Sequence, residues 1–446
     1  FRNPIFNLIC IHKSMKRGIA LLLIFFSLGI QLSLAQRYPK RKILKDLKEL
    51  PGFQNAFIGF KLYDTGKNRL VAEQYADQYM TPASTTKLFT YQAGLNYLPR
   101  TVSAMEYVIK GDSLIFWSTG YPLTLHPDHR DSTVVKFLAA SDKQLYYWSR
   151  PMEDERFGPG WGWDDYAGYY GAEKSVFPIY GNSVHVIVDN QKKEFSTSPT
   201  HPGLRFTERD STDTRTRVNR DEFWNEFEIK YKELDEGDSV TIDTLIRPFR
   251  YSDPLFIDLI GQASGKQIKQ IEDYHRPKTF ETLAGVAADS LYKWMLQPSD
   301  NLFAEQILMM ISGNSSDTLS TEKAIKLAQA STNIKTELVW RDGSGLSRYN
   351  MFRPNEILDV LKSIDFSVAE KLFPQGQTSG TIEDWYTPNV YAKTGTLSNN
   401  HSLAGYIKTD SGKTLIFVMI ANHYTAPITT IRESFGVMLK KIQKAY

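Results

Sequence analysis

The chain has 446 residues, which is enough for two or three domains with sizeable cores. Its composition, 41% hydrophobic and 23% charged, is that of an ordinary globular protein and excludes the collagenous, disordered and disulfide-rich classes. The formal net charge of +3 misleads, because the first 35 residues hold four basic and no acidic side chains. The remainder is close to neutral, so no nucleic-acid-binding protein is indicated.

Residues 15–35 have the pattern of a secretory signal peptide. Lys16-Arg17 precedes an apolar stretch that is short for a membrane span, and small residues follow it. We therefore expect residues 1–14 to precede the true start codon and the mature protein to act outside the cytoplasm, in the periplasm, without a stable membrane span. The single cysteine, Cys10, lies upstream of the signal, so neither a disulfide nor a lipid anchor at the cleavage point is expected.

Two predicted hairpins lie near opposite ends of the mature chain. Residues 57–63 and 69–72 are rich in β-formers and flank a Gly-containing turn, and residues 402–407 and 414–420 repeat this arrangement. A helix beginning near Pro427 follows the second hairpin. An antiparallel sheet covered by helices would unite these segments, which predicts an α+β fold.

A candidate nucleophile lies in the segment Thr81-Pro82-Ala83-Ser84-Thr85-Thr86-Lys87-Leu88. Apolar residues at helical spacing follow it, and a proline suits the entrance of that helix. Residues three apart share a helix face, so the Lys87 amine can reach the Ser84 hydroxyl as a general base. Taken alone, the pattern is better explained by an N-cap serine followed by an exposed lysine, and only its partner motifs favour the catalytic interpretation.

Residues 105–270 differ from the rest of the chain. They are rich in β-formers, turns and charge, and strands are expected at 107–109, 114–117 and 184–188. We predict that 105–270 is a β-rich insertion, and that residues 36–104 and 271–446 together form one domain.

Two later motifs give Ser84 and Lys87 possible partners. Ser299-Asp300-Asn301 leads directly into a predicted helix, and Lys393-Thr394-Gly395-Thr396 resembles the edge of a strand. Together with Ser-x-x-Lys they form the signature of penicillin-binding proteins and class A β-lactamases. Tyr180-Gly181-Asn182 is an alternative to the Ser-x-Asn element, but no helical segment follows it.

Each motif residue has a predicted role. Lys393 would be the cation that helps to depress the pKa of Lys87, and Ser299 would relay a proton to the leaving amine. Asn301 would orient the substrate amide. Thr394 and Thr396 suit a terminal carboxylate, and Gly395 allows the substrate to approach the backbone closely. The backbone N–H groups of Ser84 and Thr396 would form the oxyanion hole.

With these motifs, residues 45–440 resemble the D-alanyl-D-alanine carboxypeptidase/endopeptidase family, the class C low-molecular-mass penicillin-binding proteins. Asp342-Gly343-Ser344-Gly345 and the segment Pro159-Gly160-Trp161-Gly162-Trp163-Asp164-Asp165 also match. The resemblance implies a β-lactamase/transpeptidase-like sheet and an acyl-enzyme on Ser84 formed from peptidoglycan stem peptides. It also implies covalent inhibition by β-lactams, and it makes Asp165 a reader of the stem-peptide amine.

Two other classes of protein share part of this pattern. A serine β-lactamase would need a deacylating glutamate in a Glu-x-x-Leu-Asn pattern, which the sequence lacks. A catalytically idle wall scaffold would not need the intact motifs. No metal-ligand spacing occurs, so no metal or other cofactor is expected. Asp342–Gly345 is interpreted as a shaped loop rather than a second nucleophile, and Tyr121 as a departure from the family's Gly-Asp-Pro. Trp161 and Trp163 are interpreted as core or interface residues rather than as platforms that stack on sugars.

Overall fold

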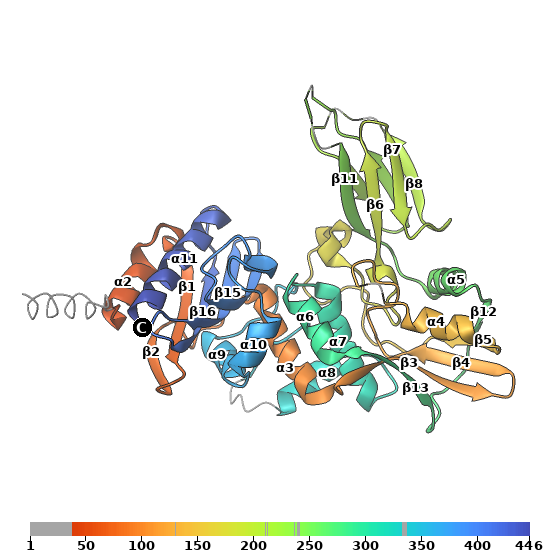
Figure 1. The fold of residues 1–446 in the computed structure, drawn as a ribbon, viewed down its shortest axis with the longest axis horizontal. Coiled ribbons are helices and arrows are strands. Elements are labelled where there is room, and N and C mark those ends of the chain that lie inside the picture. The colour runs from red at the N-terminus through yellow and green to blue at the C-terminus, as the bar shows by residue number, and fades with distance from the viewer. Residues whose placement is uncertain are drawn as a thin grey trace, which may run out of the picture.

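The structure is a computed structural model that describes residues 38–129, 131–209, 211, 213–235, 237–238, 241–331 and 337–446. The predicted upstream segment and signal peptide lie outside the described residues, as does Cys10. Figure 1 shows a sheet with covering helices at one end, a second β-rich region at the other, and helices between them. Two short sheets project from the second region.

The first sheet has the order β14-β15-β16-β1-β2, and all its pairs are antiparallel. Its strands are β1 (Phe57–Asp64), β2 (Arg69–Gln74), β14 (Val390–Leu397), β15 (Asn400–Lys408) and β16 (Thr414–Asn422). Both predicted hairpins are confirmed, as β1 with β2 and β15 with β16. This sheet joins segments near both ends of the described chain, as the α+β prediction required.

Strand β16 is apolar along nearly its whole length because both faces of the sheet are covered. Phe417 and Met419 belong to the core beneath α2 (Lys40–Glu49) and α11 (Ile428–Ala445). Ile416 and Val418, on the opposite face, join the larger core that includes α9 (Pro354–Lys362). Side chains alternate across a strand, so a central strand between two helical layers needs apolar residues at consecutive positions.

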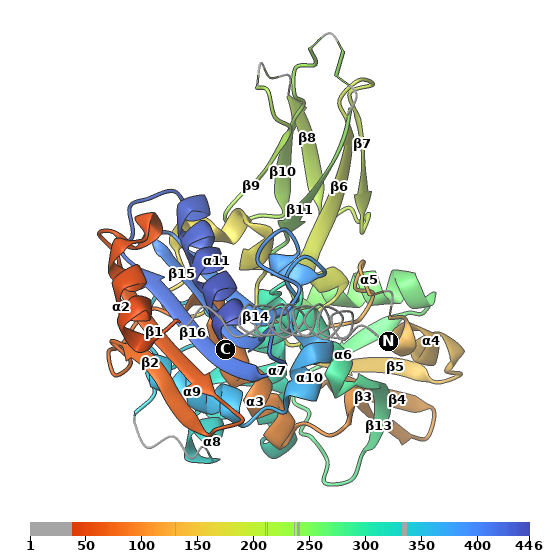
Figure 2. The ribbon, with the colours of Figure 1, turned by 60° about the vertical axis from the view of Figure 1, so that its left-hand side comes forward.

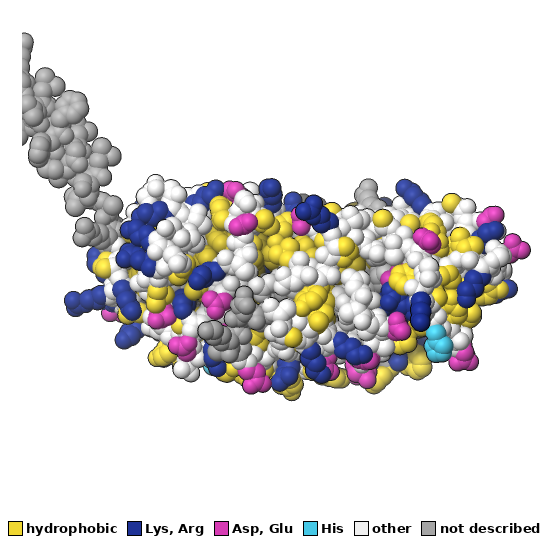
Figure 3. Space-filling view, turned by 90° about the horizontal axis from the view of Figure 1, so that it is seen from below, with side chains coloured by type: hydrophobic (Ala, Val, Ile, Leu, Met, Phe, Trp, Pro, Cys, Tyr) yellow, Lys and Arg dark blue, Asp and Glu magenta, His cyan; other side chains and the backbone are white. Residues whose placement is uncertain are grey.

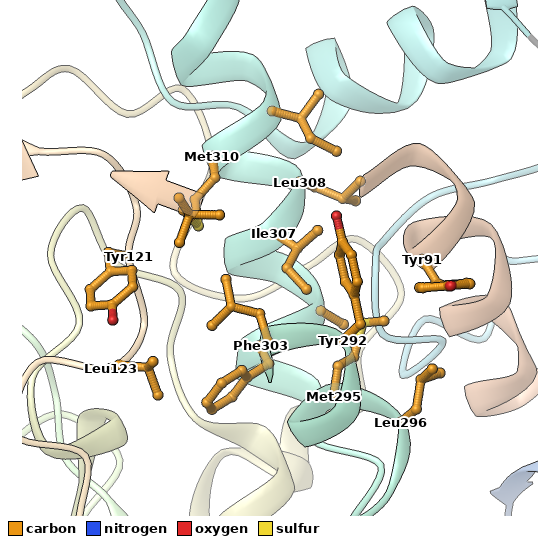
Figure 4. Close-up of a cluster of buried hydrophobic side chains, with 14 of the residues drawn as sticks. Tyr91, Tyr121, Leu123, Tyr292, Met295, Leu296, Phe303, Ile307, Leu308 and Met310 are labelled. Carbon is orange, nitrogen blue, oxygen red and sulfur yellow. The ribbon is translucent and has the colours of Figure 1, made fainter. Parts of the chain in front are cut away.

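The helical centre consists of α3 (Lys87–Tyr97), α6 (Ala288–Leu296), α7 (Asn301–Ser315), α8 (Thr321–Ser331) and α10 (Phe366–Leu372). Figure 4 shows Tyr91 of α3 beside Tyr292 of α6, and their ring centroids lie 5.0 Å apart. A Cβ at Gly94 would lie 2.6 Å from the Tyr292 ring, so this glycine permits the close approach of the two helices. In this way α3 and α7, which carry motif residues, are held in one core.

The region between the Ser84 and Ser299 motifs contains a five-stranded sheet of order β12-β5-β4-β3-β13. Its strands are β3 (Thr101–Lys110), β4 (Ser113–Ser118), β5 (Gln144–Trp148), β12 (Ile268–Ile271) and β13 (Glu281–Ala287), and α4 (Thr133–Ala140) and α5 (Asp253–Ser264) accompany them. The expected strands at 107–109 and 114–117 are β3 and β4, paired antiparallel.

The projecting part consists of two three-stranded sheets, β11-β6-β7 and β8-β10-β9 (Figure 2). They comprise β6 (Ser183–Asp189), β7 (Glu194–Ser198), β8 (Arg205–Arg209), β9 (Arg217–Arg220), β10 (Glu226–Lys230) and β11 (Ile242–Pro248). The expected strand at 184–188 is β6.

The surface carries mixed charge. On the face in Figure 3, acidic and basic side chains are interspersed, and basic ones gather at the end that carries α2. None of the helices in the described part of the chain combines the length and apolarity that a bilayer span requires.

Candidate active site

Ser84 lies on η2 (Ala83–Thr86), a single 3₁₀ turn that leads into α3. The hydroxyls of Thr85 and Thr86 donate to the carbonyls of Pro82 and Ala83, at 2.7 and 2.8 Å, and lock the turn. Ala83 has a φ of 49°, an unusual value for a residue with a side chain. Strain of this kind next to a reactive group is common where the surrounding structure fixes its position.

Two glycines allow other segments to approach this turn. A Cβ at Gly345 would lie 2.0 Å from the Ala83 carbonyl oxygen, and a Cβ at Gly395 would lie 2.7 Å from the Ser84 backbone nitrogen. Ser402 on β15 also donates to the Pro82 carbonyl, at 2.6 Å. The turn is therefore enclosed by β14, β15 and the loop at 342–347.

The Lys87 amine is completely buried and contacts three oxygens. Its Nζ lies 3.0 Å from Ser84 Oγ, 2.6 Å from Asn301 Oδ1 and 2.7 Å from the Ser344 carbonyl. Burial lowers the pKa of Lys87 to about 8, although the charges of Asp342, Asp300 and Glu305 act in the opposite direction. A buried lysine with a pKa near neutrality is suited to a general base.

The Ser299 motif lies at the start of α7, as its sequence context predicts. Asp300 caps the helix by accepting the Phe303 N–H at 2.8 Å, and burial raises the pKa of Asp300. Asn301 connects two regions, because its Oδ1 accepts from Lys87 and its Nδ2 donates to the Tyr170 carbonyl at 2.9 Å. Ser299 has a φ of 66°, a second strained position.

Lys393 on β14 is also buried, and its Nζ donates to Ser299 Oγ and to the Thr394 carbonyl, both at 2.7 Å. Burial, reinforced by the charge of Lys87, holds the pKa of Lys393 well below its usual range. Thr394 shares a hydrogen bond of 2.7 Å with Thr381, and Thr396 contacts His401 Nδ1 at 2.9 Å. The structure thus brings all three motifs together.

Two buried carboxylates organise the loop at 342–347. Asp342 accepts from Trp161 Nε1, the Gly345 and Ser347 backbone N–H groups and Asn350 Nδ2, at 2.6–2.9 Å. The second, Glu305, accepts from the N–H groups of Gly343 and Ser344, at 3.0 and 2.8 Å.

Burial and the nearby Asp342 charge raise the pKa of Glu305 to about 7. Because the Ser344 carbonyl contacts Lys87, the loop belongs to the site itself. The sequence predicted a shaped loop at 342–345 but gave Glu305 no role. The one feature that could have drawn attention to Glu305 is its position among apolar residues of a predicted helix.

A cavity of about 880 Å³ opens beside these motifs. Ser84, Ser299, Asn301, Thr394 and Thr396 line it, together with Asp165 from the inserted region. Three histidines that sequence reasoning did not single out also line it: His126, His129 and His185. Burial lowers the pKa values of His126 and His129 to about 4, so both are uncharged at neutral pH.

Asp165 already has partners within the chain. Its Oδ2 accepts the Gly162 N–H at 3.0 Å and lies 3.5 Å from Arg348 Nη1, and its Oδ1 accepts from the Tyr170 hydroxyl at 3.2 Å. A substrate amine would therefore share this carboxylate with Arg348.

The amino-acid sequence also matches a known protein family. Residues 143–442, well over half of the chain, match the D-Ala-D-Ala carboxypeptidase 3 (S13) family. The chain belongs to this family. It is also 30% identical over 175 residues to penicillin-sensitive carboxypeptidase A of Dictyostelium discoideum, covering 34% of this chain and 33% of that protein.

A second relative is D-alanyl-D-alanine carboxypeptidase DacB of Haemophilus influenzae, 30% identical over 151 residues, covering 30% of this chain and 32% of that protein. The matches thus span about a third of the length of each relative. The solved structure of penicillin binding protein 4 from Haemophilus influenzae has a TM-score of 0.70 at 20% identity, covering 90% of this chain and 97% of the other. That similarity confirms the β-lactamase/transpeptidase-like fold.

The alternative motif at Tyr180-Gly181-Asn182 does not take the position that Ser299-Asp300-Asn301 has beside Lys87. Asn182 is completely buried; its Nδ2 donates to the Glu173 carbonyl and to Ser175 Oγ, at 2.9 and 2.7 Å. Its Oδ1 accepts the Ile179 N–H at 3.2 Å. These bonds use the Asn182 amide to fold its own loop, whereas the amide of Asn301 contacts Lys87.

Three aromatic residues singled out from the sequence also have definite environments. Tyr121 is buried and its hydroxyl donates to Asp131 Oδ2 at 2.5 Å, so it serves as a core residue (Figure 4). Trp161 is partly buried and bonded to Asp342, which agrees with an interface role. Trp163 does not agree with that interpretation, because 73% of its surface is exposed.

Proposed function

We propose that this protein is a secreted serine DD-peptidase that acts on peptidoglycan stem peptides through an acyl-enzyme on Ser84. The observation that carries the proposal is the environment of the Lys87 amine, which contacts the nucleophile, Asn301 and a loop carbonyl at once. Membership of the S13 family supports the same activity.

The contacts of Lys87 suit a neutral base. A neutral amine has two N–H groups and one lone pair, and the Asn301 and Ser344 oxygens are acceptors that can only receive N–H groups. The lone pair is then directed at Ser84 Oγ, 3.0 Å away. With a pKa of about 8, roughly a tenth of the Lys87 side chains are neutral at pH 7.

In the acylation step Ser84 Oγ attacks the carbonyl of the penultimate D-alanine and Lys87 takes its proton. The tetrahedral oxyanion accepts from the N–H groups of Ser84 and Thr396. The C–N bond then breaks, and the leaving amine receives a proton from Lys87 through Ser299. Water hydrolyses the resulting ester and regenerates Ser84.

The residues of β14 suit the carboxylate end of the substrate. Thr394 and Thr396 line the cavity, and the buried Lys393 lies beside them with its amine on Ser299. Burial and the charge of Lys87 lower the pKa of Lys393, so this pair disfavours a second charge on Lys393. Burial lowers the pKa of Lys87, and the cation role predicted for Lys393 is not its cause. Gly395 keeps the strand close to the catalytic turn, where a side chain would not fit. Asp165 would attract the side-chain amine of the stem peptide from the opposite wall.

We further propose that the protein acts outside the cytoplasmic membrane, where its substrate lies, with β-lactams as covalent inhibitors.

The inserted region has wider limits than its sequence suggested, because β3 and β13 belong to the same sheet as the inserted strands. The proposed insertion therefore extends from about residue 101 to about residue 287, beyond the expected 105–270.

Purified muropeptides test the activity directly. Incubation with the protein should release D-alanine or split cross-linked dimers, and mass spectrometry identifies which of these reactions occurs. Fluorescent penicillin should label the chain with slow release. Turnover of a chromogenic cephalosporin at many cycles per second would instead favour a β-lactamase, and absence of both labelling and hydrolysis would favour an idle scaffold.

A further inference from the structure

A group of exposed aromatic side chains lies beside the mouth of the cavity. Five residues are each more than half exposed, and we call them the aromatic rim: Trp163 (73%), Tyr169 (66%), Phe223 (54%), Trp224 (63%) and Tyr349 (62%). Large aromatic surfaces are usually buried, so a cluster of this kind marks a place where something binds.

Local contacts tie two parts of the rim to neighbouring segments. Trp163 Nε1 donates to Glu222 Oε1 at 3.0 Å, which joins it to the turn that carries Phe223 and Trp224. Tyr349 lies against Gly160, where a Cβ would meet its ring at 2.6 Å. The segment of residues 160–180, yellow in Figure 1, lies between the projecting strands and the central helices.

One member of the rim, Tyr169, belongs to the cavity wall. Tyr169 lines the cavity and packs edge-on against Tyr170, with ring centroids 5.5 Å apart. The Tyr170 carbonyl in turn accepts from Asn301. A ligand that leaves the cavity on this side therefore contacts Tyr169 of the rim.

The backbone of the turn that carries Phe223 and Trp224 is fixed by hydrogen bonds. Asp221 Oδ1 accepts the backbone N–H groups of Phe223 and Trp224, at 2.8 and 2.9 Å, and closes the turn. Arg250 donates to the Phe223 carbonyl at 2.7 Å. A preformed aromatic surface loses little conformational entropy when a ligand binds.

We propose that the aromatic rim binds the glycan strand of peptidoglycan, the polymer to which the stem peptide is covalently attached. This inference rests on the proposed function, because it takes the cavity as the stem-peptide site. Rings of β-linked N-acetylated amino sugars present apolar C–H faces that stack on Trp and Tyr, and their hydroxyl and amide groups need polar partners. Asp164, Glu222 and Arg348 supply such partners between the rings.

Charge argues against a lipid surface as the occupant. Asp164 and Glu222, next in sequence to Trp163 and Phe223, would repel anionic headgroups, whereas Asp165 is buried and paired with Arg348. A neutral saccharide fits this mixture of apolar rings and acidic acceptors.

The experiment compares intact sacculi with sugar-free substrate. The test variant is the double substitution Phe223→Ala/Trp224→Ala, which lies outside the cavity, with Trp163→Ala as a second variant. Phe57→Ala is the matched control, because Phe57 is an exposed aromatic that does not line the cavity. Co-sedimentation with purified sacculi gives the binding affinity, and fluorescent penicillin and a sugar-free pentapeptide report on the catalytic residues.

We expect both test variants to bind sacculi about tenfold more weakly than the unmodified protein and Phe57→Ala. Penicillin acylation and pentapeptide hydrolysis should stay within about twofold in all four proteins. Soluble N-acetylglucosamine oligomers should also change the tryptophan fluorescence of the unmodified protein, and less so that of the variants.

Unchanged sacculus binding in both test variants would overturn the proposal. A dimer of the unmodified protein that dissociates in Phe223→Ala/Trp224→Ala would also overturn it, because the rim would then be an interface between copies. Failure of the proposed function is distinguishable from both outcomes, since the unmodified protein would then neither react with penicillin nor hydrolyse the pentapeptide, whatever its affinity for sacculi.

Discussion

Replacing Gly345 by alanine tests whether the loop at 342–347 holds the catalytic turn in position. A Cβ at Gly345 would lie 2.0 Å from the Ala83 carbonyl oxygen and 2.5 Å from its carbonyl carbon. Non-bonded heavy atoms normally stay about 3.5 Å apart, so the turn or the loop has to move by about 1 Å or more. A displacement of roughly 1 Å at a reacting group can reduce a rate about 10²-fold.

Gly412 offers a matched control. Its φ of 82° is almost the same as the 81° of Gly345, but a Cβ at Gly412 would have no heavy atom within 4 Å. Alanine in the left-handed region costs about 1 kcal/mol at either position. Only Gly345→Ala adds the collision with Ala83, so the comparison separates backbone strain from displacement of the nucleophile.

The assay is the second-order rate constant for acylation by fluorescent penicillin, measured where circular dichroism shows both variants folded. We expect acylation of Gly345→Ala to be about 100-fold slower and that of Gly412→Ala to stay within about twofold of the unmodified protein. Thermal unfolding should show a small loss of Tm for Gly412→Ala and a larger one for Gly345→Ala. Equal acylation rates in the two variants would refute the reasoning.

Three further predictions concern individual groups of the site. Asn301→Ala should slow acylation by about 10²–10³-fold. Asn182→Ala should mainly lower Tm, because its three local hydrogen bonds are lost. A slower acylation in Asn182→Ala than in Asn301→Ala would revive the Tyr180 alternative. The acylation rate should rise about tenfold per pH unit below pH 8 and level off above pH 8. The reason is that Lys87 must lose its proton to act as a base, and burial lowers its pKa to about 8. An acylation rate that is constant between pH 6 and 9 would argue against Lys87 as the base. Asp165→Asn should lower kcat/KM about tenfold for stem peptides with a free side-chain amine and leave penicillin acylation unchanged. Equal effects on both reactions would indicate general destabilisation. No effect on either reaction would mean that Asp165 has only a structural role.

The sheet and the catalytic motifs could be predicted because their signals are local. The apolar run of β16 and its turn to β15 encode a buried hairpin in consecutive residues. The spacing of Ser84 and Lys87 encodes a contact within one helical turn, and the structure has it at 3.0 Å. Asp300 begins a helix because its side chain caps it. Each of these features depends on neighbours within a few positions.

The features that sequence reasoning missed depend on contacts between distant segments. Glu305 looks like an ordinary helical acid until α7 packs against the loop whose N–H groups it accepts. Trp163 resembles a core residue, and only the tertiary arrangement leaves it exposed. The site roles themselves and the division into domains stay predictions.

Ser84 is the proposed nucleophile, and an acyl group should form on it. Incubation of the protein with penicillin, followed by proteolysis and mass spectrometry, tests it most directly. We predict one penicilloyl adduct on the peptide that contains Ser84, and no adduct in a Ser84→Ala variant with an unchanged Tm. Stoichiometric labelling of Ser84→Ala, or an adduct on another peptide of the unmodified protein, would show that Ser84 is not the nucleophile.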